Sequence, residues 1–465
     1  MKTTVLVALL ALGVATASGQ VTKQAGRGGL SAEDLKTISA AYADTPADRA
    51  IQNAITNNSI EKLAINSRNR YSAPDMNFTY RVPQKGITNQ KSSGRCWLFT
   101  GLNVIRSQMV NDNNLPKLTL SQNYNFFFDQ LEKSNLFLQA IIDNAKEPLT
   151  SRQNEWLMKN ALGDGGTFAG VMDNVMKYGV VPSEAMPETA SSESTSSMRK
   201  LVTLKLKEDA LELRKMIADG KSAKAVEARK MEQLGEIYRM LALNLGVPPT
   251  EFKWTRRDKK GNAVDTRTYT PQEFYKRFSG KDLENSFAML MNDPSRPYYE
   301  MYEIDLDRHS YDGHNWKYLN VPMEEIKQAA IASLKDTTAM YFSCDVGKFI
   351  DRTNGVLDPN NFDYGSLMGV TFGMDKADRI RTAASGSTHA MTLVGVNLDE
   401  NGQPDKWLIE NSWGPGANDG HLIATDPWMD EYLFRLVVDT KYLSDKAAKA
   451  SKKKATLLPA WDPMF

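Results

Sequence analysis

The sequence predicts an α+β fold in which helices dominate the first half of the chain and strands the last third. Apolar residues at helical spacing follow Cys96, with Leu98 and Leu102 on one face. Two longer helical stripes fill residues 199–246. Short apolar runs that are typical of buried strands occur between residues 339 and 439. This segregation of helices and strands along the chain is typical of an α+β arrangement.

The composition is that of a globular protein without a metal-binding or nucleotide-binding signature. The chain has 465 residues, of which 41% are apolar and 24% charged, and this length allows two or three domains or one large decorated domain. A net charge of +1 does not indicate a general binder of polyanions. Two cysteines exclude a disulfide-stapled scaffold. No zinc spacing, phosphate loop or dinucleotide fingerprint is present, so we expect no metal and no cofactor.

Residues 1–19 have the pattern of a secretory signal peptide. A lysine follows Met1, an apolar run extends from Val5 to Val14, and small residues come next. The run is too short to span a bilayer, and a buried N-terminal helix is the competing interpretation. We expect cleavage near Ser18 or Gln20 and a periplasmic or extracellular protein.

Three segments follow before the β-rich part of the chain. Residues 20–82 are predicted to form an N-terminal extension, with a capping-box pattern at Ser31. Residues 83–195 form a mainly helical lobe. Residues 196–290 form a basic helical insertion, in which Gly220 separates two helices. Between residues 199 and 260 there are 16 Lys or Arg against 9 Asp or Glu, an excess of 7.

The insertion admits two interpretations. A basic helical face can bind nucleic acid, but it is more often simply solvated. Tyr238, the one aromatic residue of the helical pair, lies on an apolar stripe, so nucleic-acid binding is the less favoured interpretation. The predicted stripes comprise Leu206, Ala210, Leu213 and Ile217 in the first helix, and Met231, Leu234, Tyr238, Leu241 and Leu245 in the second.

Residues 291–445 are predicted to form a β-rich lobe, and residues 446–465 a C-terminal tail. Strands are expected at 339–344, 389–396, 406–410 and 434–439, with a helix after Pro322. Cys344 falls in the first of these strands, and we interpret it as structural. His309 and His314 lie in a polar stretch and are interpreted as surface or local hydrogen-bonding residues.

Four residues suggest nucleophilic catalysis. Gln90 lies six residues before Cys96, and His389 and Asn411 follow much later. Taken singly, a cysteine or a histidine is usually a core residue. Together they supply a thiol at a helix N-terminus that favours its thiolate and a general base, His389. Asn411 would orient His389, and the Gln90 amide would bind an oxyanion with the Cys96 N–H.

Gln, Cys, His and Asn in this order are the catalytic set of papain-like thiol hydrolases. The chain resembles the bleomycin hydrolase and aminopeptidase C subfamily of papain-like cysteine peptidases over most of its length. The motifs that carry the resemblance are residues 87–98, 164–166, 177–182, 188–193, 355–358 and 459–464. It implies a papain-like two-lobed fold, with His389 and Asn411 on the β-rich lobe across a cleft from Cys96.

The resemblance also implies roles for residues outside the catalytic set. Gly165 and Gly166 match a pair whose backbone binds the peptide substrate, although a simple turn would also account for them. Trp413 matches a tryptophan that shields the His–Asn hydrogen bond, which is compatible with a core position. The insertion matches one that family members use to form a homohexamer.

The C-terminal tail is expected in or near the cleft. The resemblance implies that the terminal carboxylate, here on Phe465, binds the amino group of the substrate. Relatives usually run a few residues past the methionine at 464, so we expect looser end selection in this chain. A frayed terminus without a role is the alternative.

These observations predict a thiol aminopeptidase that acts on peptides through a Cys96 acyl-enzyme. A papain-like endopeptidase or a dipeptide-releasing exopeptidase is the second hypothesis. The third is a non-catalytic assembly or nucleic-acid-binding protein, which the complete catalytic set argues against. Transglutaminase-type acyl transfer uses a similar triad, but the sequence around each residue favours a peptidase.

Overall fold

A computed structural model of the protein describes residues 28–70, 74–83, 86–115 and 118–465. The predicted signal peptide at residues 1–19 therefore lies outside the described residues. The chain divides into two compact units, Met1–Leu63 and Ala64–Phe465. Residues 64–82, which we assigned to the N-terminal extension, thus group with the larger unit.

The described part of the smaller unit consists of short helices. They are α1 (Ala32–Ser39), α2 (Pro46–Asn57) and α3 (Ile60–Leu63). The capping box predicted at Ser31 is present, because its hydroxyl accepts from the Asp34 N–H at 3.1 Å and its own N–H donates to the Asp34 carboxylate at 2.8 Å. Thr45 begins α2 in the same way.

A 12-stranded mixed sheet forms the centre of the larger unit. Its order is β14-β5-β6-β4-β13-β7-β10-β11-β12-β9-β8, with β1 also pairing with β10. The strands are β1 (Tyr80–Arg81), β4 (Phe287–Met291), β5 (Glu300–Ile304), β6 (Lys317–Asn320), β7 (Met340–Cys344), β8 (Ile350–Asp351), β9 (Val356–Leu357), β10 (His389–Leu398), β11 (Pro404–Glu410), β12 (His421–Thr425), β13 (Leu433–Asp439) and β14 (Thr456–Leu458). A separate hairpin pairs β2 (Phe252–Arg257) with β3 (Ala263–Tyr269). All four strands that we predicted are present.

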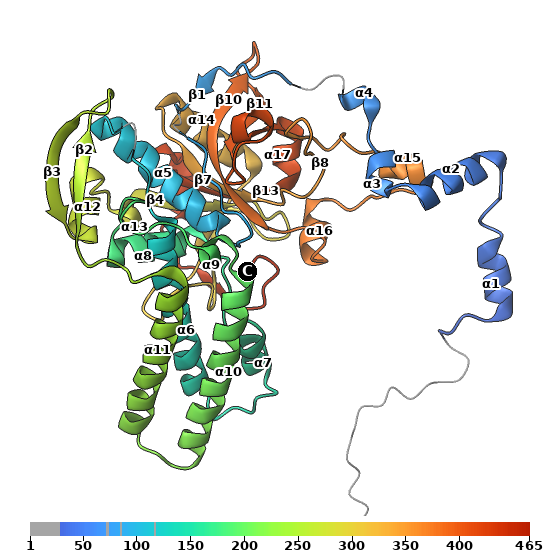
Figure 1. The fold of residues 1–465 in the computed structure, drawn as a ribbon. Coiled ribbons are helices and arrows are strands. Elements are labelled where there is room, and N and C mark those ends of the chain that lie inside the picture. The colour runs from blue at the N-terminus through green and yellow to red at the C-terminus, as the bar shows by residue number, and fades with distance from the viewer. Residues whose placement is uncertain (1–27, 71–73, 84–85, 116–117) are drawn as a thin grey trace, which may run out of the picture. The chain divides into compact units, whose positions relative to one another are not determined.

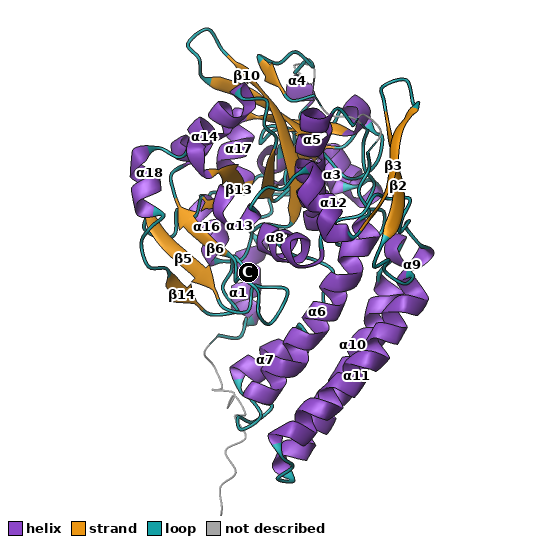
Figure 2. Ribbon diagram, turned by 90° about the vertical axis from the view of Figure 1, so that its left-hand side faces the viewer, coloured by secondary structure: helices purple, strands orange, loops and turns teal. Residues whose placement is uncertain are grey.

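Helices surround the sheet and form a separate bundle (Figures 1 and 2). The long ones are α5 (Cys96–Asn113), α6 (Gln122–Asp143), α10 (Ser196–Ala218), α11 (Ala223–Leu245) and α14 (Met323–Lys335). The shorter ones are α4 (Ser67–Arg70), α7 (Arg152–Lys159), α8 (Phe168–Tyr178), α9 (Ala190–Glu193), α12 (Pro271–Phe278), α13 (Leu283–Ser286), α15 (Tyr364–Met368), α16 (Lys376–Arg381), α17 (Asp426–Tyr432) and α18 (Asp445–Ala450), with 3₁₀ turns at Ala417–Gly420 and Thr440–Tyr442. Helix α5 packs against β10 of the sheet, whereas α6, α10 and α11 pack together and extend away from it.

Two buried clusters correspond to these two regions. One joins the inner faces of the long helices and reaches the sheet at Tyr341. The other lies within the sheet and under α14 and α17, and it contains Cys344. The Cys344 thiol is fully buried, and burial raises its pKa well above the ordinary thiol value. An inert buried cysteine agrees with our structural interpretation of this residue.

Two sequence-based interpretations are wrong in detail. Met231 and Tyr238 were placed on the apolar stripe of the second helix, but they are 58% and 39% exposed. The buried face of α11, which includes Leu234, Leu241 and Leu245, is turned toward α6 and α10. His309, interpreted as a surface or local hydrogen-bonding residue, is instead 5% exposed, and its hydrogen-bonding partners Asp129 and Thr167 lie 180 and 142 residues away in the sequence. His314 is exposed, as expected. No helix in the described part of the chain is long and apolar enough to cross a membrane.

Candidate active site

Cys96 is the first residue of α5, preceded by Arg95 at the N-cap position. The partial positive charge of the helix N-terminus therefore lies at the sulfur. Ser92, Ser93 and Gly94 provide no side-chain cap for this helix. Instead, the preceding loop is anchored by the buried Arg95 guanidinium, which forms an ion pair with Glu188 at 2.8 Å. Cys96 therefore lies between the Arg95–Glu188 ion pair, which anchors the preceding loop, and helix α5, of which it is the first residue.

His389 begins β10 and faces the same cavity as Cys96. Its Nε2 lies 2.9 Å from the Asn411 side-chain oxygen, so Nε2–H donates and Nδ1 remains for the thiol. The backbone N–H of Ala390, the residue after His389, acts to lower the pKa of the Cys96 thiol. The indole of Trp413 lies against the His389 ring, with centroids 5.0 Å apart. The structure therefore brings together Cys96, His389, Asn411 and Trp413.

Burial and hydrogen bonding shift the pKa values of Cys96 and His389 in opposite directions. Burial raises the pKa of the Cys96 thiol, and the backbone amides of Ala390 and Trp97 oppose that rise. Burial lowers the pKa of His389 to about 4, and the Asn411 hydrogen bond opposes the decrease. Each charge taken alone is thus unfavourable in the cavity. Proton transfer from the thiol to the imidazole creates both charges together, so that they stabilise each other.

Gln90 is fixed beside Cys96 by its neighbours. Its backbone N–H donates to the Ser412 carbonyl at 2.8 Å, and its side-chain oxygen accepts from the Ser412 hydroxyl at 2.6 Å. Its side-chain nitrogen donates to the Ser93 carbonyl at 2.7 Å. These bonds use one amide hydrogen and leave the second for an oxyanion. Sequence reasoning missed the contribution of Ser412, although this residue lies within the Asn-Ser-Trp-Gly run.

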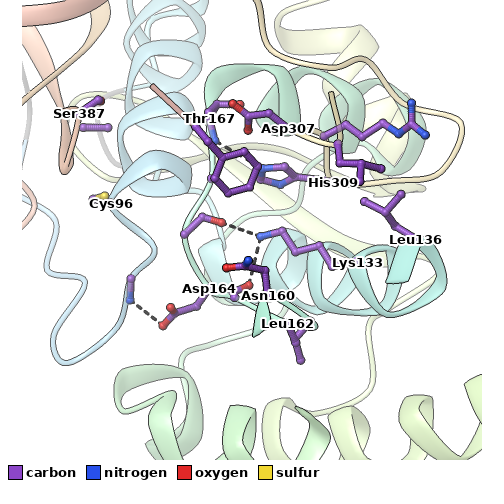
Figure 3. Close-up of a pocket in the computed structure, with 18 of the residues that line it drawn as sticks. Cys96, Lys133, Leu136, Asn160, Leu162, Asp164, Thr167, Asp307, His309 and Ser387 are labelled. Carbon is purple, nitrogen blue, oxygen red and sulfur yellow. Dashed lines mark hydrogen bonds between the residues drawn. The ribbon is translucent and has the colours of Figure 1, made fainter. Parts of the chain in front are cut away.

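The loop 163–167, which contains the predicted glycine pair, forms one wall of the cavity (Figure 3). Lys133 Nζ donates to the carbonyl oxygens of Gly163 at 3.2 Å and Gly165 at 2.6 Å. The Trp97 indole N–H donates to the Asp164 carbonyl at 2.9 Å. A side chain on Gly165 would meet no atom within 4 Å. This side of the loop is therefore open for the close approach of a substrate backbone.

A buried histidine supports the same loop from behind. His309 Nδ1 lies 2.6 Å from Asp129, and its Nε2 accepts from the Thr167 N–H at 3.4 Å. A Cβ on Gly166 would lie 2.1 Å from the His309 ring, so Gly166 is needed to admit this histidine. Burial lowers the pKa of His309, which agrees with a neutral ring that accepts at Nε2. Sequence reasoning missed this contact because the two partners lie 142 residues apart.

The C-terminal segment docks against the same cavity. Phe465 lines it, and its ring lies 4.9 Å from that of Trp156 in an edge-to-face contact. Met464 is 1% exposed, and its carbonyl oxygen accepts from the Arg435 guanidinium. Asp462 forms an ion pair with Arg296. The tail expected in or near the cleft therefore reaches the cavity with its last residue, Phe465.

The site as a whole is a cavity of about 560 Å³ between the helical part and the sheet. The nucleophile candidate comes from the N-terminus of a buried helix and the base from the start of a neighbouring strand. This arrangement and the fold define a papain-like cysteine peptidase, in which a thiol, an imidazole and an amide are aligned for acyl transfer.

The chain belongs to the Peptidase C1-like family, whose model matches residues 29–465. It is 36% identical to an aminopeptidase C of Streptococcus thermophilus over 438 residues, which cover 94% of this chain and 98% of that protein. It is 37% identical to human bleomycin hydrolase over 400 residues, covering 83% of this chain and 88% of that protein. The crystal structure of PepW from Lactobacillus rhamnosis superposes with a TM-score of 0.90 at 36% identity, covering 94% of this chain and 99% of that one.

Proposed function

We propose that this protein is a thiol aminopeptidase that removes residues from the amino terminus of peptides. The observation that carries the proposal is the combination of Cys96, at the N-terminus of α5, with the hydrogen-bonded His389–Asn411 pair in one cavity. The relatives named aminopeptidase C and bleomycin hydrolase support the proposal because they match nearly the whole chain.

The reaction proceeds through a thioester. Cys96 Sγ attacks the carbonyl carbon of the peptide bond while its proton is taken by His389. The second amide hydrogen of Gln90 and the backbone N–H of Cys96 bind the oxyanion. Collapse of the intermediate forms the acyl-enzyme, and His389 protonates the leaving amine. Water, deprotonated by His389, then hydrolyses the thioester and regenerates the thiol. Asn411 keeps the imidazole oriented through both steps.

The C-terminal segment 459–465 accounts for the choice of peptide end. Its last residue, Phe465, lines the cavity, and the segment is anchored by Arg296, Arg435 and Trp156. A peptide bound in the cleft has little room beyond its first residues on that side, so cleavage occurs near the amino terminus. We propose that the terminal carboxylate of Phe465 limits this space. Release of dipeptides as well as single residues is the second candidate.

The test compares one fluorogenic peptide amide with a free and with an acetylated amino terminus. We expect hydrolysis of the free form and little of the acetylated one. Cys96→Ala and His389→Ala should abolish the activity while the thermal midpoint stays close to that of the wild type, and Asn411→Ala should lose less. Deleting Trp461 to Phe465 should increase cleavage of the acetylated peptide. Equal hydrolysis of both peptides by the full chain would instead support an endopeptidase.

We further propose that copies of this chain associate through the helical insertion into a homohexamer. The helices α10 and α11 carry exposed apolar residues, and such residues on a helix surface are typical of a contact with another protein chain. They are Leu201, Leu204, Leu211, Met231 and Leu243. Leu204→Glu is expected to reduce the sedimentation coefficient of an assembled protein, whereas Lys200→Glu, on the same helix, serves as the control. Nucleic-acid binding remains the less favoured role of this insertion.

We also propose that the protein is exported to the periplasm or the extracellular space. The support is the sequence pattern at residues 1–19.

A further inference from the structure

Asn103 is a buried amide on the helix that begins with Cys96. It lies seven residues after Cys96 on α5, two turns along, so the two side chains project from the same face of the helix. Asn103 is 2% exposed and is not one of the residues that line the cavity. Any effect of Asn103 on the reaction must therefore act through the residues that it binds.

The two amide hydrogens of Asn103 bind two different segments of the chain. The side-chain nitrogen donates to the hydroxyl oxygen of Thr88 at 2.9 Å and to a carboxylate oxygen of Glu410 at 3.0 Å. An amide nitrogen carries two hydrogens, so both are used. The partners lie 15 and 307 residues away in the sequence.

Each partner belongs to a segment that carries a residue of the site. Thr88 lies two residues before Gln90, the candidate oxyanion donor. Glu410 is 1% exposed and ends β11, directly before Asn411, which orients the imidazole. The single amide of Asn103 thus links the helix of the nucleophile to both of these segments.

The other contacts between this helix and the sheet have less directional character. Helix α5 packs against β10, whose buried residues are mostly apolar. Burial of apolar surface is non-directional, whereas a hydrogen bond has a preferred length and angle. The two bonds of Asn103 are therefore suited to fix the register of α5 along the sheet.

Stability alone does not account for an amide at this position. The side-chain oxygen of Asn103 is buried and has no hydrogen-bond partner among the described residues. A buried carbonyl oxygen without a partner is costly, and an apolar side chain of similar shape would avoid that cost. The bonds that the nitrogen donates give the amide a role that such a side chain could not take.

We propose that Asn103 is a positioning residue, which fixes Cys96 relative to Gln90 and Asn411. The inference rests on the proposed thiol peptidase function, since only a reaction at Cys96 makes this alignment matter. A misplacement of about 1 Å between reacting groups can cost about 10²-fold in rate. Loss of the Asn103 bonds should therefore slow the chemical step more than it weakens substrate binding.

The first test compares Asn103→Leu with Asn125→Leu. Asn125 is also a buried amide, and its nitrogen donates to Asn174 at 2.8 Å and to Gly179 at 3.0 Å, away from the catalytic segments. Both variants should have a lower thermal midpoint. Only Asn103→Leu should lower kcat on an aminoacyl fluorogenic amide, about 10–100-fold and with little change in KM, when each protein is assayed well below its midpoint.

The second test, Asn103→Asp, keeps the size of the side chain but removes its donors. At about pH 8 the new carboxylate faces that of Glu410, and the two repel. Burial already raises the pKa of Glu410 to about 7, and a second carboxylate raises it further. At about pH 5 the pair therefore holds a proton, and one carboxyl group can donate to the other.

The link between α5 and β11 should consequently return in acid. The ratio of kcat in Asn103→Asp to kcat in the wild type should rise several-fold from about pH 8 to about pH 5, whereas the ratio for Asn103→Leu stays constant. The other charged or titratable groups near Glu410 are Arg106 on α5 and His421, its partner on β12. They are the same in all of these proteins.

The outcomes separate the inference from the function on which it rests. A kcat in Asn103→Leu that falls no further than in Asn125→Leu would overturn the inference. So would a constant ratio for Asn103→Asp, which serves as the test if Asn103→Leu does not fold. A wild type that hydrolyses no aminoacyl amide would contradict the proposed function instead.

In that case the rate of Cys96 alkylation by iodoacetamide, followed by mass spectrometry, tests the positioning role without a substrate. The rate should fall in Asn103→Leu, because the thiol is no longer aligned with the imidazole of His389. It should stay at the wild-type value in Asn125→Leu. Equal rates in the wild type and Asn103→Leu would overturn the inference.

Discussion

Two hydrogen bonds orient the Gln90 side chain, and their partners, Ser412 and Ser93, do not line the cavity. Ser412 holds its side-chain oxygen and Ser93 accepts one amide hydrogen. We expect Gln90→Ala to lower kcat by about 10²–10³, the usual effect of losing one oxyanion donor. Ser412→Ala should lower kcat less, because the Ser93 bond remains. Steady-state kinetics on one aminoacyl amide would show this order, and an unchanged kcat in Gln90→Ala would contradict the role of this residue.

The buried imidazole of His389 determines how activity responds to acid. Burial lowers the pKa of His389 to about 4. Above that pH the Cys96–His389 pair of the free enzyme holds one proton, and below it the pair holds two. We therefore expect kcat/KM to be maintained above about pH 4 and to fall as pH decreases through that value.

A second ionisation near the site belongs to Glu410, which precedes Asn411. Burial raises the pKa of Glu410 to about 7, although Arg106 opposes the increase. The control for the pH profile is therefore Glu410→Gln, which should remove any inflection near 7 and leave the acid limb near 4. An acid limb that moves in Glu410→Gln would contradict the assignment to His389.

At the scale of elements, the glycine loop depends on α6 and on the segment after β5. Lys133 and Asp129 come from α6, whereas His309 comes from that segment. The two glycines consequently have different roles: Gly166 admits the His309 ring, and Gly165 faces the open cavity. Only the role of Gly165 corresponds to the binding of the substrate backbone that the family resemblance implied.

This difference can be measured with two alanine substitutions. Gly166→Ala should destabilise the protein by about 1–3 kcal/mol, the usual cost of overpacking, because its Cβ would lie 2.1 Å from His309. Gly165→Ala should leave stability unchanged and lower kcat/KM, since its methyl group would meet the substrate. Urea unfolding and kinetics would test both. Adding His309→Ala to Gly166→Ala should show positive coupling between the sites; additive effects would exclude the contact.

At the scale of the whole molecule, export of this chain is a prediction that depends on the sequence pattern at residues 1–19. The signal-peptide pattern predicts that the mature protein begins near Ser18 or Gln20. N-terminal sequencing of protein recovered from the producing cells and from their medium would measure this directly. An intact Met1 in all of the protein would contradict export.

The sequence by itself determined the local features of this protein. Helical spacing after Cys96, the helix pair around Gly220 and the four predicted strands all depend on periodicity within short windows. The catalytic set was recognisable because its members lie in short, specific motifs. The capping box at Ser31 needs only residues three positions apart.

Only the tertiary structure decided which distant residues support the site. His309, Asp129 and Thr167 meet although they lie up to 180 residues apart, and no local pattern marks them. The same holds for Met231, whose exposure depends on how α11 packs. Burial and hydrogen bonding are properties of contacts between segments, and a contact between segments far apart in the chain leaves no periodicity in either one.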